Sequence, residues 1–138
     1  MRYELTVGDI VLESNNDNVI RKVDFLISQE NLETNDKSDS LFNTLVVEGE
    51  IKDSTQQKTK ELLDWSMKTG KADVYKTVKL IVKKDEDVLR DYRLENMYCV
   101  SYQEFFHGDD SGRSDTYGKF ILKMRQRKGL IGTINVTC

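Results

Sequence analysis

The chain has 138 residues, of which 38% are hydrophobic and 33% are charged, and its formal net charge is −3. This length and composition predict a single domain, residues 1–138, with one core. The sequence lacks the clustered Lys and Arg of a nucleic-acid-binding surface. It has no apolar run near the ~20 residues that cross a bilayer, and its two cysteines are too few for a disulfide framework.

The first part of the chain is predicted to form strands. Residues 2–12 begin with alternating apolar and polar side chains, and Gly8–Asp9 suits a bulge or a turn. A turn-forming cluster at 14–18 precedes a second alternating segment, residues 19–27. After the polar stretch 33–40, residues 41–51 carry apolar side chains on both faces. This pattern is typical of a strand that is buried on both sides.

A single helix is predicted from Ser54 to about Thr69. Ser54 and Gln57 have the spacing of a capping box, in which two backbone amides at the start of a helix are satisfied reciprocally. Gly70 suits the left-handed conformation that ends many helices. We interpret Trp65, on the apolar side of this helix, as packing against the sheet.

Strands are again predicted over residues 74–84, 88–106 and 117–125, with a short last strand within 130–136. In the long second strand we expect a change of alternation phase near residues 94–97. We also expect Tyr98 and Tyr102 to share one face and Phe105 to lie on the other. These patterns predict a mainly β fold: an antiparallel β-barrel or sandwich of about seven strands with one α-helix, at about residues 54–69.

Candidate catalytic groups are sparse. Cys99 and His107 are eight residues apart, which is roughly 26 Å in an extended strand, so they meet only if the chain folds back. A triad or a calcium site near His107 would draw on Asp109, Asp110, Ser111, Ser114 and Asp115. No G-x-S-x-G motif is present, and the spacing is not that of an EF-hand. We therefore predict no enzyme activity, no cofactor and no metal site.

The order of the later elements resembles that of the tail-tube and Hcp-type tube proteins of contractile injection systems. These systems include phage tails, phage-tail-like particles and type VI secretion. The helix KTKELLDWSMKTGK is followed directly by VYKTVKLIVKK, and then by YRLENMYCVSYQEFF. The last segment is similar to the Leu-x-Asn-x-x-Val-x-x-Tyr strand of Hcp-like proteins. The matching positions are Leu94, Asn96, Cys99 or Val100, and Tyr102.

The similarity covers roughly residues 39–128, ending in the strand 117–125 after a Gly/Ser/Asp-rich loop. It has two departures. The first strand carries few markers of the family, and the loop at 33–40 is shorter than in many relatives. These departures leave the mode of ring stacking open.

The resemblance implies a two-sheet barrel protomer, six copies of which join edge to edge into a ring. Stacked rings would form the inner tube of a phage tail or of an injection or secretion apparatus, with sheath and baseplate or spike proteins as partners. The chain has no signal-peptide core. We therefore expect it to be made in the cytoplasm and then to belong to a phage-like particle or to be exported with the apparatus.

Two groups of residues are candidate sites under this hypothesis. The candidate inter-ring loops contain Glu33, Asn35, Asp36, Lys37, Asp39, His107, Asp109, Asp110, Arg113 and Asp115. The candidate lumen charges are Lys76, Lys79, Lys83, Arg93, Glu95, Lys119, Lys123 and Arg125. An outer, solvated sheet face explains the second group equally well, and the pattern alone leaves open which sheet faces the lumen.

A second hypothesis has the same strand pattern without the ring. It is a small, monomeric β-barrel module that binds a ligand or a partner peptide. The mass of the protein in solution separates the two hypotheses.

Overall fold

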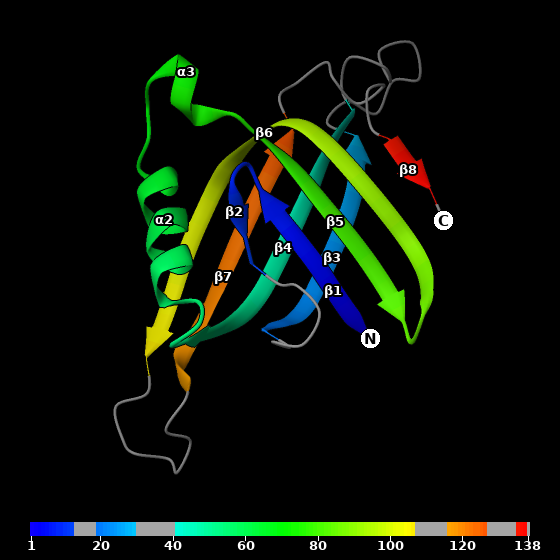
Figure 1. Ribbon diagram of the computed structural model, residues 1–138. Coiled ribbons are helices and arrows are strands. Elements are labelled where there is room, and N and C mark those ends of the chain that lie inside the picture. The colour runs from blue at the N-terminus through cyan, green and yellow to red at the C-terminus, as the bar shows by residue number, and fades with distance from the viewer. Residues whose placement is uncertain (13–18, 30–40, 107–115, 127–134, 138) are drawn as a thin grey trace.

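The computed structural model describes residues 1–12, 19–29, 41–106, 116–126 and 135–137 (Figure 1). The described strands are β1 (Arg2–Val7), β2 (Ile10–Val11), β3 (Ile20–Gln29), β4 (Leu41–Lys52), β5 (Lys76–Lys84), β6 (Asp87–Phe106), β7 (Thr116–Gln126) and β8 (Asn135–Thr137). The helices are α2 (Gln56–Ser66) and α3 (Lys71–Val74). The predicted mainly β, antiparallel fold is confirmed. The strand count exceeds the expected seven because the chain turns at Gly8, where φ is +60°, and divides the first strand into β1 and β2.

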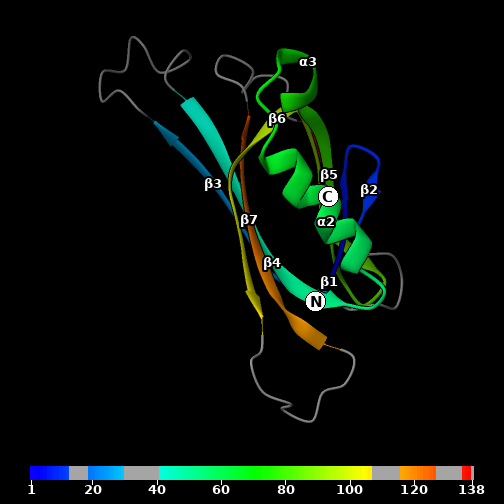
Figure 2. The ribbon, with the colours of Figure 1, turned by 90° about the vertical axis from the view of Figure 1, so that its left-hand side faces the viewer.

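The strands follow the order β2-β1-β5-β6-β7-β4-β3, with every neighbouring pair antiparallel, and β8 pairs with β6. The long strand β6 belongs to two layers. Its residues 87–97 join β5, β1 and β2 in what we call the first half-sheet. Its residues 97–106 join β7, β4 and β3 in the second half-sheet. Figures 1 and 2 show the two half-sheets facing each other.

β6 changes layer at a bulge. Val78 pairs with Leu94 and Lys76 pairs with Met97, so three steps along β6 oppose two steps along β5. Within the bulge Asn96 has φ +57°, in the left-handed region that Asn tolerates better than most residues. The extra residue lets Leu94 and Met97 both face the core, where both are fully buried. The phase change predicted near residues 94–97 is therefore confirmed.

A second irregularity in β6 lies at Val100, because Cys99 pairs with Met124 but Ser101 pairs with Lys123. The unpaired residue reverses the alternation, so Tyr98 and Tyr102 point to opposite faces. The prediction that these two tyrosines share a face is wrong for this reason. Tyr102 packs on the core, with its ring centroid 6.1 Å from that of Phe120.

The core fills the space between the half-sheets. The first half-sheet contributes Leu5, Val7, Val78, Leu80 and Leu94, and the second contributes Leu45, Val47, Phe120, Leu122 and Met124. Each of these side chains is fully buried, and burial of a side chain of this size stabilises a fold by roughly 1.5–3 kcal/mol. On the other face of β4 Thr44 and Glu50 are buried, but Phe42, Val46 and Glu48 are only partly covered, so the prediction of a strand buried on both sides holds only in part.

α2 is shorter than the predicted helix, and both of its predicted ends are wrong. Its N-cap is Thr55, not Ser54, and no side chain caps the helix. The buried Thr55 hydroxyl instead accepts a hydrogen bond from the Lys52 N–H (2.9 Å) and donates one to the Glu50 carbonyl (3.1 Å), which ties the helix to the end of β4. Gly70 has φ −73° and precedes the short helix α3, so it is not a left-handed cap.

α2 closes the opening between β2 and the second half of β6 (Figure 2). Leu62 and Trp65 lie in the core, with exposed fractions of 0% and 4%. The Trp65 Nε1–H donates to the Val74 carbonyl at 2.9 Å, and the Tyr102 hydroxyl donates to the Thr59 carbonyl at 3.3 Å. The interpretation of Trp65 as a packing residue is confirmed.

The layer change in β6 can be tested at Asn96, whose side chain is exposed. Asn96→Gly should retain the stability of the protein, because Gly adopts positive φ without strain. Asn96→Ala should unfold at lower urea, with a loss of about 1 kcal/mol relative to Asn96→Gly, because a Cβ at positive φ clashes with the backbone. Gln103→Ala, also exposed on β6, is the control and should change little. Equal stability of the Ala and Gly variants would contradict the strained crossing.

Candidate assembly interface

The predicted inter-ring loops connect strands at opposite ends of the second half-sheet. At one end Gln29 pairs with Leu41, and the nearby Thr44 of β4 pairs with Arg125 of β7. At the other end Phe106 pairs with Gly118, and Lys52 of β4 pairs with the first residue of β7. The hairpin of β3 and β4 and the hairpin of β6 and β7 therefore lead away from each other. The ten loop residues named above, at 33–39 and 107–115, lie outside the described residues.

The predicted lumen charges are not brought together. Lys79, Lys83 and Arg93 lie on the outer face of the first half-sheet, and Glu95 follows Arg93 with its carboxylate 3.5 Å from the guanidinium Nε. Lys119, Lys123 and Arg125 lie on the outer face of the second half-sheet, on the other side of the core. Lys76 lies apart from both groups, with its side chain against the backbone of Gly8.

The cations of β7 are held in place by their neighbours on the outer face of the second half-sheet. The Lys119 ammonium lies 3.3 Å from a Glu48 oxygen and 5.2 Å from the Phe105 ring centroid. The Arg125 guanidinium lies 4.8 Å from the Phe42 ring centroid, and its Nε donates to the Thr44 hydroxyl at 3.1 Å. This face is a mixed surface of paired charges and half-covered aromatic rings, with cations along its centre.

The second half-sheet ends in two long strand edges. β3 forms one edge, and residues 97–106 of β6 form the other. Among the described strands, none pairs with β3 on the side away from β4 over residues 22–29, and none but β7 pairs with residues 98–106 of β6. Because neighbouring strands alternate in direction, these two outer edges run antiparallel to each other. Leu26 and Ile27 of β3 are 58% and 50% exposed.

Sequence reasoning did not identify these edges. A strand pattern shows which residues share a face, but it does not show which strand lies last in a sheet. The signal that was available is at residues 26–27, where two consecutive apolar residues occupy both faces of one strand.

The described residues offer little chemistry. Cys99 is half-buried, and burial raises the pKa of its thiol from an ordinary value of 9.0 to about 11. A nucleophilic cysteine needs the opposite shift, toward the thiolate. No three His, Cys, Asp or Glu side chains in the described part of the chain are grouped to hold a metal ion. No helix in that part is long and apolar enough to span a membrane.

No protein-family model matches the sequence, and neither does any curated protein. Several solved structures are similar in fold. Hcp1 from Flavobacterium johnsoniae has a TM-score of 0.58 and 18% identity, over 97% of this chain and 93% of that chain. A type six secretion system protein has a TM-score of 0.61 and 13% identity, over 88% of this chain and 76% of that chain.

A third similar structure comes from the sheath-tube complex of an extracellular contractile injection system, PVC, in its extended state. It has a TM-score of 0.52 and 14% identity, over 99% of this chain and 88% of that chain. The three similarities extend over nearly the whole chain and agree with the resemblance seen in the sequence. The protein therefore has the Hcp-like tube-protein fold.

Proposed function

We propose that the protein is a structural subunit that assembles into rings, and that the rings stack into the inner tube of a phage tail or of a contractile injection or secretion apparatus. It performs no catalysis. The observation that carries this proposal is the second half-sheet, whose two long outer edges run antiparallel to each other. The outer edge of one copy would pair antiparallel with the opposite edge of the next, as neighbouring strands already do within each copy.

Ring closure follows from the chemistry of these edges. An edge strand presents a row of unsatisfied N–H and C=O groups, which pair readily with another chain. If β3 of one copy pairs with residues 97–106 of β6 in the next, the contact is head to tail, and it closes into a ring when the rotation per copy is right. The number six comes from the resemblance alone.

The proposal also selects the face that lines the channel. The first half-sheet and α2 cover one face of the second half-sheet and leave its outer face bare. In a ring the bulkier side of each copy belongs at the larger radius, where more room is available. The bare face, with Lys119, Lys123 and Arg125, then lines the channel, whereas Lys79, Lys83 and Arg93 face away from it.

Stacking would use the two hairpins, since they leave the second half-sheet at opposite ends. Each ring then presents the hairpin of β3 and β4 on one side and the hairpin of β6 and β7 on the other. Sheath and baseplate or spike proteins are the further partners that we propose. The similar structure from a sheath-tube complex supports this part of the proposal.

A monomeric binding module is the second candidate. The observation that favours it is an open pocket beside α2. Native mass measurement with negative-stain imaging distinguishes the two functions. Rings or stacked tubes support the tube subunit, and a monomer of 16.0 kDa at high concentration supports the module.

The exposed apolar residues of β3 provide a test of ring closure. The double variant Leu26→Lys/Ile27→Lys should keep its fold, because both side chains are at least half exposed. Its assembly should require at least about tenfold more protein, since burying each apolar side chain at a contact contributes on the order of 1.5 kcal/mol. Sedimentation velocity distinguishes single protomers from assembled rings and so measures the protein concentration that assembly requires. Val88→Lys, 41% exposed at the start of β6, is the control. Rings that form as readily from the double variant would argue against pairing through β3.

The hairpin loops provide a separate test of stacking. Charge reversal at Asp36 or at Asp110 should shorten tubes or leave single rings. The unfolding temperature should not change, because no residue of these polar loops is predicted to lie in the core. Tube length in electron micrographs is the measurement. Tubes of normal length from both variants would contradict a role for these loops in stacking.

The absence of a catalytic thiol is tested by alkylation in the Cys138→Ser variant. A pKa of about 11 for Cys99, against 9.0, leaves about one hundredth of the thiolate at pH 8. Folded protein should therefore react with iodoacetamide about 100-fold more slowly than the same protein unfolded in urea. A folded-state rate equal to or above the unfolded rate would reveal an activated thiol.

A further inference from the structure

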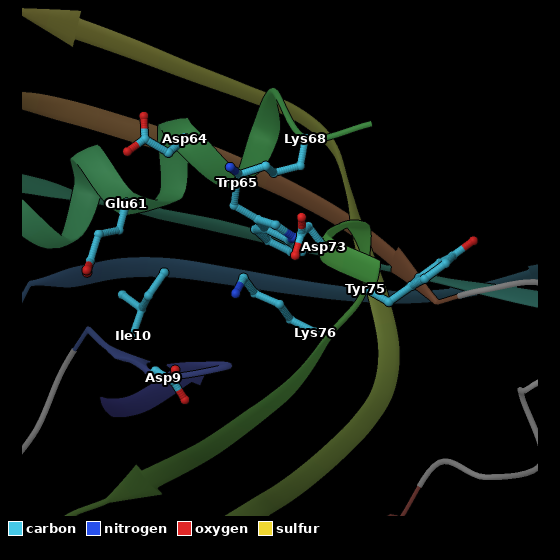
Figure 3. A pocket seen from close by; sticks show the side chains of 9 residues that line it. All are labelled: Asp9, Ile10, Glu61, Asp64, Trp65, Lys68, Asp73, Tyr75 and Lys76. Atoms are coloured by element: carbon cyan, nitrogen blue, oxygen red, sulfur yellow. The ribbon is translucent and has the colours of Figure 1, made fainter. Parts of the chain in front are cut away.

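An open pocket of about 350 Å³ lies between α2, α3, the turn from β1 to β2, and the start of β5 (Figure 3). Two of its lining residues are apolar and nearly buried, Ile10 at 7% and Trp65 at 4% exposure. In Figure 3 these two side chains lie among charged groups that come from all four segments. The volume is at the low end of the range for ligand sites, and it suits one side chain better than a large cofactor.

The charged groups of the pocket are mostly acidic. Asp9, Glu61, Asp64 and Asp73 carry carboxylates, against the two ammonium groups of Lys68 and Lys76. None of the four carboxylates makes an ion pair with a described residue. They are also not grouped closely enough to hold a metal ion, in the part of the chain that the structure describes. The pocket thus has an excess of two negative charges, spread around an apolar floor.

We propose that this pocket binds an arginine side chain of a partner polypeptide. The aliphatic stem of arginine would lie on Ile10 and Trp65, as long cationic side chains do on apolar surfaces. The planar guanidinium has five N–H donors and reaches separated carboxylates, whereas an ammonium or a metal ion needs its ligands around one point. Lys68 and Lys76 limit the pocket to one added cation, because their ammonium groups would repel a second one.

This pocket is separate from the surfaces proposed for assembly. It is built from α2, α3, the β1–β2 turn and the start of β5, none of which belongs to the second half-sheet. An arginine can therefore enter it in a single protomer or in a ring, and the proposal does not depend on ring formation. Charge complementarity selects the partner: a basic segment binds, and an acidic segment is repelled.

Trp65 is the only tryptophan of the chain, so its fluorescence reports on the pocket directly. The probe is the capped tripeptide acetyl-Gly-Arg-Gly-amide, titrated to millimolar concentrations. The same peptide with citrulline, which keeps the shape of arginine but lacks its charge, is the neutral comparison, and a lysine peptide tests the preference for a guanidinium. We expect saturable binding of the arginine peptide, weaker binding of the lysine peptide and a further loss of at least fivefold for citrulline.

Substitutions of charged pocket residues test whether the peptide binds in this pocket. Glu61→Gln and Asp64→Asn should each weaken the arginine peptide about two- to fivefold, as removal of one exposed carboxylate partner does. Lys76→Gln should strengthen it by a similar factor, because it removes a competing cation. Glu86→Gln, an exposed acidic residue in the β5–β6 turn, is the matched control and should change nothing. Near-identical circular dichroism spectra establish that the variants are folded.

Three results would overturn the proposal. These are no saturable change at millimolar arginine peptide, equal binding of the citrulline peptide, and equal weakening by Glu86→Gln and Asp64→Asn. Lysine binding as tight as arginine would overturn the choice of a guanidinium. None of these readouts requires rings or tubes, so a failure here is distinguishable from a failure of the assembly proposal.

Discussion

The fold depends on one strand that is shared by two layers. β6 pairs with β5 over its first half and with β7 over its second half, and the change occurs within a few residues around Asn96 and Val100. In a regular strand Leu94 and Tyr102, eight residues apart, would share the core face, but Met97 between them would point away from the core. The two irregularities re-aim the side chains, so that Leu94, Met97 and Tyr102 all reach the same core. Their cost is the positive φ of Asn96, which packing on both sides must offset.

The shared strand also determines which edges of the sheet stay open. Because β6 carries β5 in one layer and β7 in the other, the second half-sheet has β3 at one side and the second half of β6 at the other. α2 reaches this part of β6 through the hydroxyl of Tyr102, on the core side of the strand. The outer edges that the assembly proposal uses are thus a direct result of the crossing.

Much of the fold was predictable from the sequence because burial follows alternation. Within β4 and within β7, every second residue is apolar, as at Leu45 and Val47 or at Phe120 and Leu122. A half-buried sheet requires that spacing. The bulge near Leu94 was visible as a break in the alternation. The bulge at Val100 was not, because Cys99, Val100 and Tyr102 are all apolar enough to face either side.

The helix ends and the candidate sites were harder to predict, since each depends on contacts between distant residues. Ser54 and Gln57 fit a capping box locally, but the Thr55 hydroxyl bonds to the end of β4 instead. The charged residues that were predicted to line one channel divide between the outer faces of the two half-sheets. The order of the strands in the sheet decides this division, and a sequence pattern does not show that order. The pocket unites residues near positions 9, 64 and 76, and no local pattern connects them.

The strand order has a consequence for the speed of folding. The pairing of β4 with β7 joins residues as far apart as Thr44 and Arg125, and the pairing of β1 with β5 joins the two ends of a similar loop. Such non-local contacts slow folding, because the entropy of closing a long loop is lost before the contacts are gained. The chain has no proline, so no prolyl isomerisation adds to this delay. While the protein folds slowly, the β3 edge with Leu26 and Ile27 is exposed to every other chain. Under the assembly proposal, ring formation and disordered aggregation compete for the same edge.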